Sequence, residues 1–232
     1  AVDFLEAMDV PVHKVASFEN VDLPLLRRIA ATGKPVIMST GMATLAEIDE
    51  AVNALRSAGN QQLALLKCTS SYPSPPEAMN LRTIPHLAAA FQTPVGLSDH
   101  TVGATVPVAA VALGACIIEK HFTTSRDIPS ADRAFSLEPH EFRAMVDAVR
   151  MTEKALGVVH YGVEPAEEKS RVFRRSLFVV EDVKAGELFT EENIRSIRPG
   201  HGLHTRYLEA FIGRRARQDV ARGTPLAWEL LV

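Results

Sequence analysis

The sequence has few of the features that mark several common protein classes. Only two of its 232 residues are cysteine, Cys68 and Cys116, and neither spacing nor context suggests a disulfide framework or a thiolate metal site. The longest apolar run, Val106–Ile118, is too short to span a membrane and contains a proline and a glycine. With 25 basic against 28 acidic residues, the chain lacks the basic excess of a nucleic-acid-binding surface. It also shows no signal-peptide pattern, so we expect a protein of the reducing cytoplasm.

The sequence does contain one unit that recurs five times between its N-terminus and about residue 156. Each unit is a short apolar run, a polar tip and an amphipathic segment. Short apolar runs that alternate with helical segments predict parallel strands in βαβ units. The five runs are Val12–Ala16, Pro35–Met38, Leu63–Leu66, Pro94–Leu97 and Cys116–Ile118.

Several helices have recognisable ends. Thr44 and Glu47 form a capping box, in which each side chain bonds to the other's backbone N–H at the start of a helix. Pro85 and Pro107 are expected in the first turn of their helices, where a missing N–H costs little. The helices predicted from apolar spacing are Leu23–Ala31, Leu45–Ala58 and Glu138–Leu156.

The tips of the five predicted strands carry lysine, serine, aspartate and histidine. In a (β/α)8 barrel the carboxyl ends of the strands converge on one face, where the active site lies. Loops are polar for structural reasons too, but five successive tips of this composition favour a site. The tips are Lys14–Ser17, Ser39–Thr40, Lys67–Ser70, Ser98–His100 and Glu119–His121.

Five units do not close an eight-stranded barrel. An open doubly wound sheet is the alternative, but the chain lacks the glycine-rich phosphate loop that such folds carry after a first strand. We therefore predict an α/β fold made of the C-terminal five strand–helix units of a TIM (β/α)8 barrel, residues 1–157, with three further units upstream of Ala1. The chain begins without an initiator methionine, which fits a piece of a longer protein.

The pattern changes after Gly157. Residues 158–175 are charged and are interpreted as a linker, and residues 176–232 predict a small β-rich domain with two short helical segments, Glu191–Ile194 and Arg206–Phe211. Arg198 lies in an Arg-Pro-Gly-His-Gly loop. It is either a solvated loop arginine or a bidentate contact to an anion.

Several of these segments together resemble the sialic acid synthase family over nearly the whole chain. Within that family the motifs are most similar to those of pseudaminic acid synthases. The C-terminal segment resembles the family's antifreeze-like (SAF) domain. The matching stretches are Lys14–Glu19, Met38–Met42, Lys67–Pro73, Gly96–Thr101, Ile118–Phe122, Arg175–Phe178 and Arg198–Gly202.

The resemblance implies a carbon–carbon bond-forming transferase. Phosphoenolpyruvate would condense with the aldehyde of an open-chain N-acetylated amino sugar to give a nonulosonic acid and phosphate. In the pseudaminate branch the acceptor would be 2,4-diacetamido-2,4,6-trideoxy-altrose. The family also implies a divalent cation, Mn²⁺ or Mg²⁺, and a homodimer in which each SAF domain caps the partner's active site.

The resemblance also assigns the metal ligands. His100 and His121 end adjacent predicted strands and match the family's two histidine ligands. Imidazole suits a manganese-class ion, and water and substrate oxygens would complete its coordination. The neighbouring Asp99, Glu119 and Lys120 are expected to orient the two imidazoles.

The substrate contacts are likewise carried over from the family. Phosphoenolpyruvate has about three negative charges, so it needs at least one ammonium group and several hydrogen-bond donors. Lys14 would act in catalysis with His100 and His121, and Lys67 and Lys120 are candidates to share the anion load. The residues matched to phosphoenolpyruvate are Lys14, Ser17, Ser39, Ser70 and Ser98, and those matched to the sugar are Tyr72, Asp132 and Arg198.

Other readings of the sequence stay open. N-acetylneuraminate and legionaminate synthases are alternatives within the family, because acceptor choice depends on a few pocket residues. A carbohydrate-binding module and a barrel metallohydrolase that uses the histidine pair are alternatives outside it. The family's acid–base glutamate and a second phosphate-binding lysine lie on strands that this sequence does not contain, so the piece is expected to be inactive and poorly stable by itself.

Overall fold

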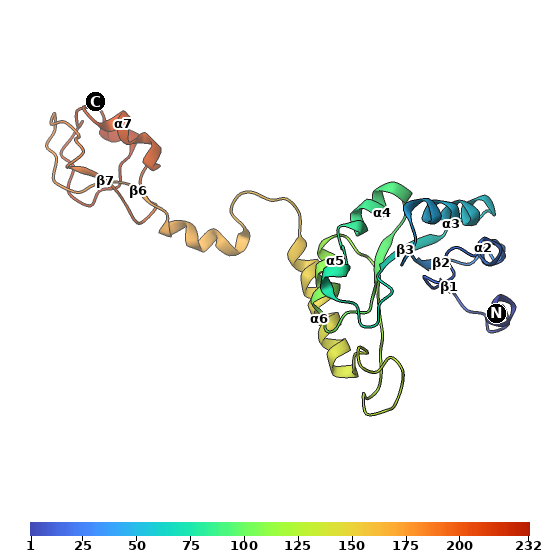
Figure 1. Cartoon of the computed structure of the whole chain (residues 1–232). Helices are drawn as coiled ribbons and strands as arrows, with labels where there is room; N and C mark the ends of the chain where they lie inside the picture. The colour runs from blue at the N-terminus through green and yellow to red at the C-terminus, as the bar shows by residue number, and fades with distance from the viewer. The chain divides into compact units, whose positions relative to one another are not determined.

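The computed structural model describes residues 1–232 and divides the chain into two compact units, Ala1–Val158 and Val159–Val232. Figure 1 shows a strand–helix unit that contains β1 to β5 and a smaller unit that contains β6 and β7. No helix in the chain is both long and apolar enough to span a bilayer.

The first unit is built on one parallel sheet with its five strands in chain order. Parallel neighbours in sequence order require a helical crossover between each pair, as the recurring unit predicts. The prediction of five strand–helix units is confirmed. The strands are β1 (His13–Val15), β2 (Val36–Ser39), β3 (Leu63–Cys68), β4 (Val95–Asp99) and β5 (Ile118–Lys120).

Capping residues and prolines mark the starts of several helices in this unit. The Thr44–Glu47 capping box forms at the start of α3, and Asp22 caps α2. Pro85 and Pro107 lie in the first turns of α4 and α5, as predicted. The elements are α1 (Val2–Ala7), α2 (Leu23–Ala30), α3 (Leu45–Ser57), η1 (Pro76–Ala78), α4 (Thr83–Phe91), α5 (Thr105–Ala112) and α6 (Pro139–Leu156).

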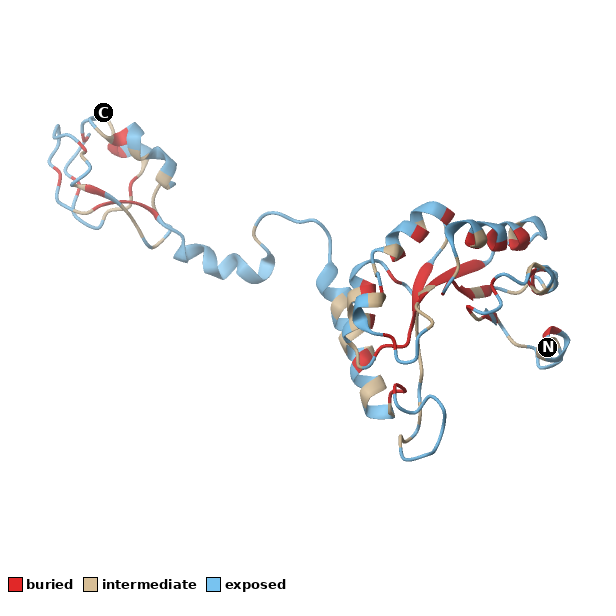
Figure 2. Cartoon of the chain, viewed as in Figure 1, coloured by how far each residue is buried: buried red, intermediate tan, exposed pale blue.

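The two faces of the sheet differ in chemistry, because side chains alternate along each strand. One face packs against the helices and forms the apolar core; Figure 2 shows buried residues on the strands and in patches on several of the helices. The opposite face is lined by polar side chains at the carboxyl ends of the strands. The core residues of the strands are Val15, Val36, Met38, Leu63, Leu65, Val95 and Leu97.

The polar face is concave. β1 and β5 are the two edge strands of the sheet, yet the Lys14 ammonium of β1 lies 3.5 Å from a carboxylate oxygen of Glu119 in β5. Side chains of opposite edges can meet only if the sheet curves around them. The sheet therefore has the curvature of part of a barrel, and its polar face is the interior.

The second unit is a small β-rich body with its own core around Phe189 and Phe211. Strands β6 (Ser176–Val179) and β7 (Ile194–Ile197) pair antiparallel, and isolated bridges complete the framework. The short helical elements η3 (Thr205–Tyr207) and α7 (Leu208–Phe211) together cover the predicted Arg206–Phe211 segment and begin one residue before it, whereas η4 (Trp228–Leu230) lies near the C-terminus.

One local expectation in the C-terminal part was wrong. The predicted Glu191–Ile194 helix is a turn, because Thr190 and Asn193 bond to each other's backbone N–H and Ile194 is buried at the start of β7. The predicted linker contains a 3₁₀ helix, η2 (Pro165–Phe173). Glu164 and Glu167 form a capping box at its start, a local signal that the charged composition obscured.

Candidate functional site

The concave face carries two layers of side chains from the five strand ends. The strand register pairs Ser39 with Leu66, Cys68 with Ser98, and Ser98 with Glu119, so these positions share one face. The next inward positions lie two residues further along each chain segment. The first layer is Lys14, Ser39, Cys68, Ser98 and Glu119, and the second is Ala16, Gly41, Ser70, His100 and His121.

Lys14 is the cation of the first layer. Its ammonium donates hydrogen bonds to Ser39 Oγ at 2.8 Å and to the Val15 carbonyl at 3.0 Å. Glu119 Oε2 lies 3.5 Å away, and Ser98 Oγ donates to Glu119 Oε1 at 2.6 Å. The Lys14 side chain is 35% exposed, so its ammonium is fixed by the protein yet open to an anion from the cavity.

Two hydroxyl groups pack against the backbone of Gly41. The Gly41 N–H donates to Ser17 Oγ at 3.0 Å. A Cβ atom on Gly41 would lie 2.6 Å from Ser17 Oγ and 2.4 Å from Ser70 Oγ, so only glycine allows both hydroxyl groups to approach the backbone this closely. Hydroxyl groups that converge on a glycine backbone are suited to phosphate or carboxylate oxygens. Both serines were predicted from the sequence as phosphoenolpyruvate contacts, whereas no role was predicted for Gly41.

The two candidate metal ligands lie side by side above the first layer. The ring centroids of His100 and His121 are 5.2 Å apart. His100 Nδ1–H donates to the Thr69 carbonyl at 2.9 Å, and His121 Nδ1 lies 3.6 Å from a carboxylate oxygen of Asp132. Both Nε2 atoms are without a hydrogen-bond partner. The Thr69 carbonyl holds one nitrogen of His100 as in metal-bound histidines, and the Asp132 carboxylate faces His121 beyond hydrogen-bond distance.

The donor set fits an open cation site. No group of three or more His, Cys, Asp or Glu side chains is arranged to enclose a metal ion by itself. The histidine pair borders a cavity of about 250 Å³ that Ser98, Asp99, Glu119 and Lys120 also line. Two imidazoles beside a cavity leave coordination positions for water and substrate oxygens, as in catalytic metal sites.

The environment of the pair shifts several pKa values. Burial and the nearby His100 lower the pKa of His121, which favours the neutral imidazole that a metal requires. Burial opposes protonation of His100 too, but its bonds to Cys68 and Thr69 raise its pKa. Burial alone would raise the pKa of the Cys68 thiol, yet hydrogen bonds from His100, Ser17 and Ser70 lower it to about 7.

Aromatic side chains stand next to the histidines. The Tyr72 ring lies 4.3 Å from the His100 ring and 5.7 Å from the Phe135 ring, between centroids, and Tyr72 is 46% exposed. Asp132, on the loop after β5, is exposed and faces His121. Two of the three residues predicted to contact the sugar, Tyr72 and Asp132, therefore lie beside the candidate metal ligands, and their roles stay predictions.

Two expectations about charged neighbours were wrong. Lys67 and Lys120 were candidates to bind the anion, but they share the helix-facing side of the sheet with the core residues. Lys67 bonds to the Cys68 carbonyl and to Thr69 Oγ1, and burial lowers its pKa. Lys120 is fully buried against Asp99.

Asp99, Glu119 and Lys120 were expected to orient the two imidazoles, and that role stays a prediction. None of the three is hydrogen-bonded to an imidazole; the carbonyl of Thr69 and the carboxylate of Asp132 face the Nδ1 atoms instead. Strand alternation is the sequence signal that would have separated inward Glu119 from outward Asp99 and Lys120.

Arg198 belongs to the second unit, on the loop that follows β7. Its side chain is exposed and makes no hydrogen bond or ion pair within the chain. An unengaged guanidinium is available for an anion or an amide carbonyl. Its predicted contact with the acceptor stays a prediction.

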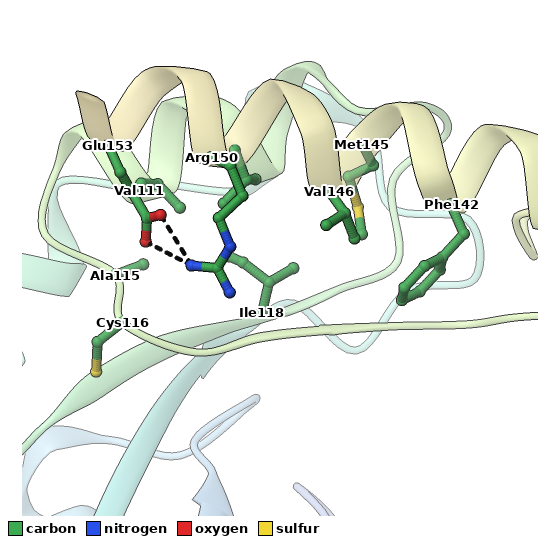
Figure 3. A pocket seen from close by; sticks show the side chains of 10 residues that line it. Val111, Ala115, Cys116, Ile118, Phe142, Met145, Val146, Arg150 and Glu153 are labelled. Carbon is green, nitrogen blue, oxygen red and sulfur yellow. Dashed lines mark hydrogen bonds and ion pairs between the residues drawn. The ribbon is translucent and has the colours of Figure 1, made fainter. Parts of the chain in front are cut away.

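A second cavity of the first unit lies on the helix-facing side. Figure 3 shows Phe142, Met145 and Val146 of α6 above Ile118 of β5, around a space of about 200 Å³. The only charged groups on its wall are the exposed ion pair of Arg150 and Glu153. It holds none of the converging donors that the concave face offers, so the candidate site is the concave face.

Comparisons with known proteins agree on the class of protein. Residues 1–161 match the model of the NeuB family, and residues 174–232 match that of the SAF domain. The chain is 46% identical over 225 residues to a pseudaminic acid synthase of Campylobacter jejuni, covering 97% of this chain and 66% of that protein. It is 40% identical to an N,N'-diacetyllegionaminic acid synthase of the same organism, covering 94% of this chain and 66% of that protein.

A solved structure gives the same result for the fold. A putative spore coat polysaccharide biosynthesis protein E of Chromobacterium violaceum superposes with a TM-score of 0.71 at 29% identity, covering 100% of this chain and 70% of that one. The chain thus spans about two thirds of the length of the curated relatives that it matches.

Proposed function

This chain belongs to the NeuB family and ends in a SAF domain, and from that premise we propose that it carries the metal- and phosphoenolpyruvate-binding half of a nonulosonic acid synthase. The reaction joins C3 of phosphoenolpyruvate to the aldehyde carbon of an N-acetylated amino sugar. One water is consumed, phosphate leaves, and a nine-carbon 2-keto acid forms.

The observation that carries the proposal is the pairing of an anion site with a histidine pair on one concave face. The concave face carries both groups of residues. The anion group is Lys14 with Ser17, Gly41 and Ser70, and the histidine pair is His100 and His121. A substrate with a carboxylate and a phosphate needs cationic and hydroxyl donors a few ångströms apart. A carbohydrate-binding module needs neither group. A metallohydrolase usually needs more carboxylate or histidine ligands, and no such cluster is present.

In the proposed roles, Lys14 neutralises one substrate anion, and Ser39 and Ser98 hold their first-layer partners in place. The hydroxyl groups of Ser17 and Ser70 donate to phosphate or carboxylate oxygens beside Gly41. His100 and His121 would hold Mn²⁺ or Mg²⁺ through Nε2. When bound, the cation supplies Lewis-acid polarisation of the acceptor aldehyde, where negative charge develops.

The acceptor in the proposal is 2,4-diacetamido-2,4,6-trideoxy-altrose. The proposal follows the greater identity to a pseudaminic acid synthase, 46% against 40% for a legionaminic acid synthase. Tyr72 and Asp132 would contact the sugar beside the histidines. In a homodimer, which is part of the proposal, Arg198 of a SAF domain would reach the acceptor's acetamido group in the other copy.

The experiment that tests the proposal measures phosphate release by the full-length protein with phosphoenolpyruvate and Mn²⁺. Each assay contains one sugar: the altrose derivative, the acceptor sugar of a legionaminic acid synthase, or N-acetylmannosamine. Release with the altrose derivative and little with the other sugars is the expected result. Release with another sugar alone would assign the protein to that branch, and release with none, while Mn²⁺ is bound, would contradict the synthase proposal.

A further inference from the structure

A buried ion pair joins the carboxyl ends of β4 and β5. Lys120 Nζ lies 2.6 Å from Asp99 Oδ2, and both side chains are 0% exposed. The two residues are register partners in the sheet. Their buried side chains share the helix-facing side of the sheet with Leu97 and Ile118, and both residues also border the cavity beside the histidines.

Thr101 extends this pair into a closed network. The Thr101 N–H donates to Asp99 Oδ1 at 2.9 Å, and the Thr101 hydroxyl donates to Asp99 Oδ2 at 3.1 Å. The ammonium of Lys120 donates in turn to the Thr101 carbonyl. Because no buried side-chain polar atom of the chain lacks a partner, the network is fully satisfied. It ties together the end of β4, the loop after it and the end of β5.

The residues of this network are the direct sequence neighbours of both histidines. His100 lies between Asp99 and Thr101, and His121 directly follows Lys120. Neighbouring side chains on a strand point to opposite faces. A bond that fixes Asp99 and Lys120 on the outer face therefore also fixes the separation and direction of His100 and His121 on the inner face.

Stability alone does not account for the pair. Removing two charges from water costs about as much as their attraction returns, and apolar residues of similar volume are often at least as stable. Leu97 and Ile118, the preceding residues on the same face of β4 and β5, are apolar. The best-attested gain from a buried polar pair at such a position is a fixed register.

We propose that Asp99 and Lys120 form a positioning pair that sets the separation and orientation of His100 and His121 for a divalent cation. The inference rests on the proposed function, in which the two histidines are the metal ligands. Neither member of the pair contacts substrate or metal. Their effect on binding passes through the strand ends that they join.

The test is the double variant Asp99→Asn/Lys120→Met, which removes both charges, keeps the side-chain volumes and leaves Thr101 an acceptor at residue 99. Its unfolding midpoint is expected to stay close to that of the unchanged protein. Its Kd for Mn²⁺ is expected to rise by about 10- to 100-fold, the usual cost of losing an outer partner of a metal ligand. The visible absorption of bound Co²⁺, which reports ligand geometry, is expected to change.

Two further variants separate positioning from general loosening. Leu97→Val trims the buried residue two positions before Asp99 on the same face and should lower the unfolding midpoint without changing Mn²⁺ affinity. Thr101→Val removes one hydrogen bond to the Asp99 carboxylate and should weaken Mn²⁺ binding by a smaller factor than the double variant does. This single variant tests the inference even if the double variant does not fold.

Three results would overturn the inference. If the double variant folds and binds Mn²⁺ and Co²⁺ as the unchanged protein does, the pair does not position the histidines. The same conclusion follows if Thr101→Val leaves Mn²⁺ affinity unchanged. If the unchanged protein and its His100→Ala/His121→Ala variant bind Mn²⁺ equally, the metal site of the proposed function itself is wrong, and the positioning role is lost with it.

Discussion

The double substitution His100→Ala/His121→Ala is expected to abolish Mn²⁺ binding at the concave face and, with it, phosphate release by the full-length protein. In each of the two imidazoles at the cavity, Nδ1 faces a carbonyl or carboxylate oxygen. This leaves Nε2 available for a metal ion. Losing both ligands should cost more than the 10- to 100-fold typical of an outer partner, so affinity should fall by more than about 100-fold. Titration calorimetry with Mn²⁺ measures the first effect and a phosphate assay the second.

A matched control uses two histidines outside the site. His86 on α4 and His140 on α6 are exposed. The variant His86→Ala/His140→Ala should bind Mn²⁺ as the unchanged protein does. Equal affinity of both double variants would mean that the cation binds elsewhere, and the assignment of the ligands would fail.

The substitution Lys14→Met is expected to weaken phosphoenolpyruvate binding by about 10- to 150-fold. Methionine keeps the apolar part of the side chain and removes the ammonium that Ser39 and Glu119 hold in place. A hydrogen bond that involves a charged group contributes about 1.5–3 kcal/mol, and each 1.4 kcal/mol is tenfold in affinity. Glu119 is also left without its cation, which adds repulsion towards an anionic substrate.

Lys34→Met provides the comparison for this experiment. Lys34 precedes β2 and pairs with Glu6 and Asp9, at the opposite end of the strands from the site. Its substitution should leave phosphoenolpyruvate affinity unchanged, as measured by calorimetry in the presence of Mg²⁺. If Lys14→Met binds as well as Lys34→Met, Lys14 is not the anion ligand.

The strands and most helices could be predicted because their signals are local. The capping box of Thr44 and Glu47 fixes the start of α3 within a few residues. Apolar runs separated by helical spacing give parallel strands without any knowledge of distant contacts. The residues that meet at the strand ends followed from the barrel rule, which brings carboxyl ends of parallel strands to one face.

The errors concern which face a charged residue occupies. Lys120 and Lys14 both stand at strand ends, but alternation in the register sends Lys14 inward and Lys120 outward to Asp99. The partner of each imidazole is a backbone carbonyl or a residue on a later loop, and neither follows from the strand sequence. The turn at residues 191–193 depends on the burial of Ile194 against a strand that lies earlier in the chain.

The position of a bound Mn²⁺ ion is the most direct test of the central claim. Crystals of the full-length protein grown with Mn²⁺ and phosphoenolpyruvate would be measured for anomalous scattering at the manganese absorption edge. We predict a peak within bonding distance of Nε2 of both His100 and His121, with the phosphoenolpyruvate anion near Lys14. A manganese peak away from both imidazoles, or the anion bound away from Lys14, would contradict it.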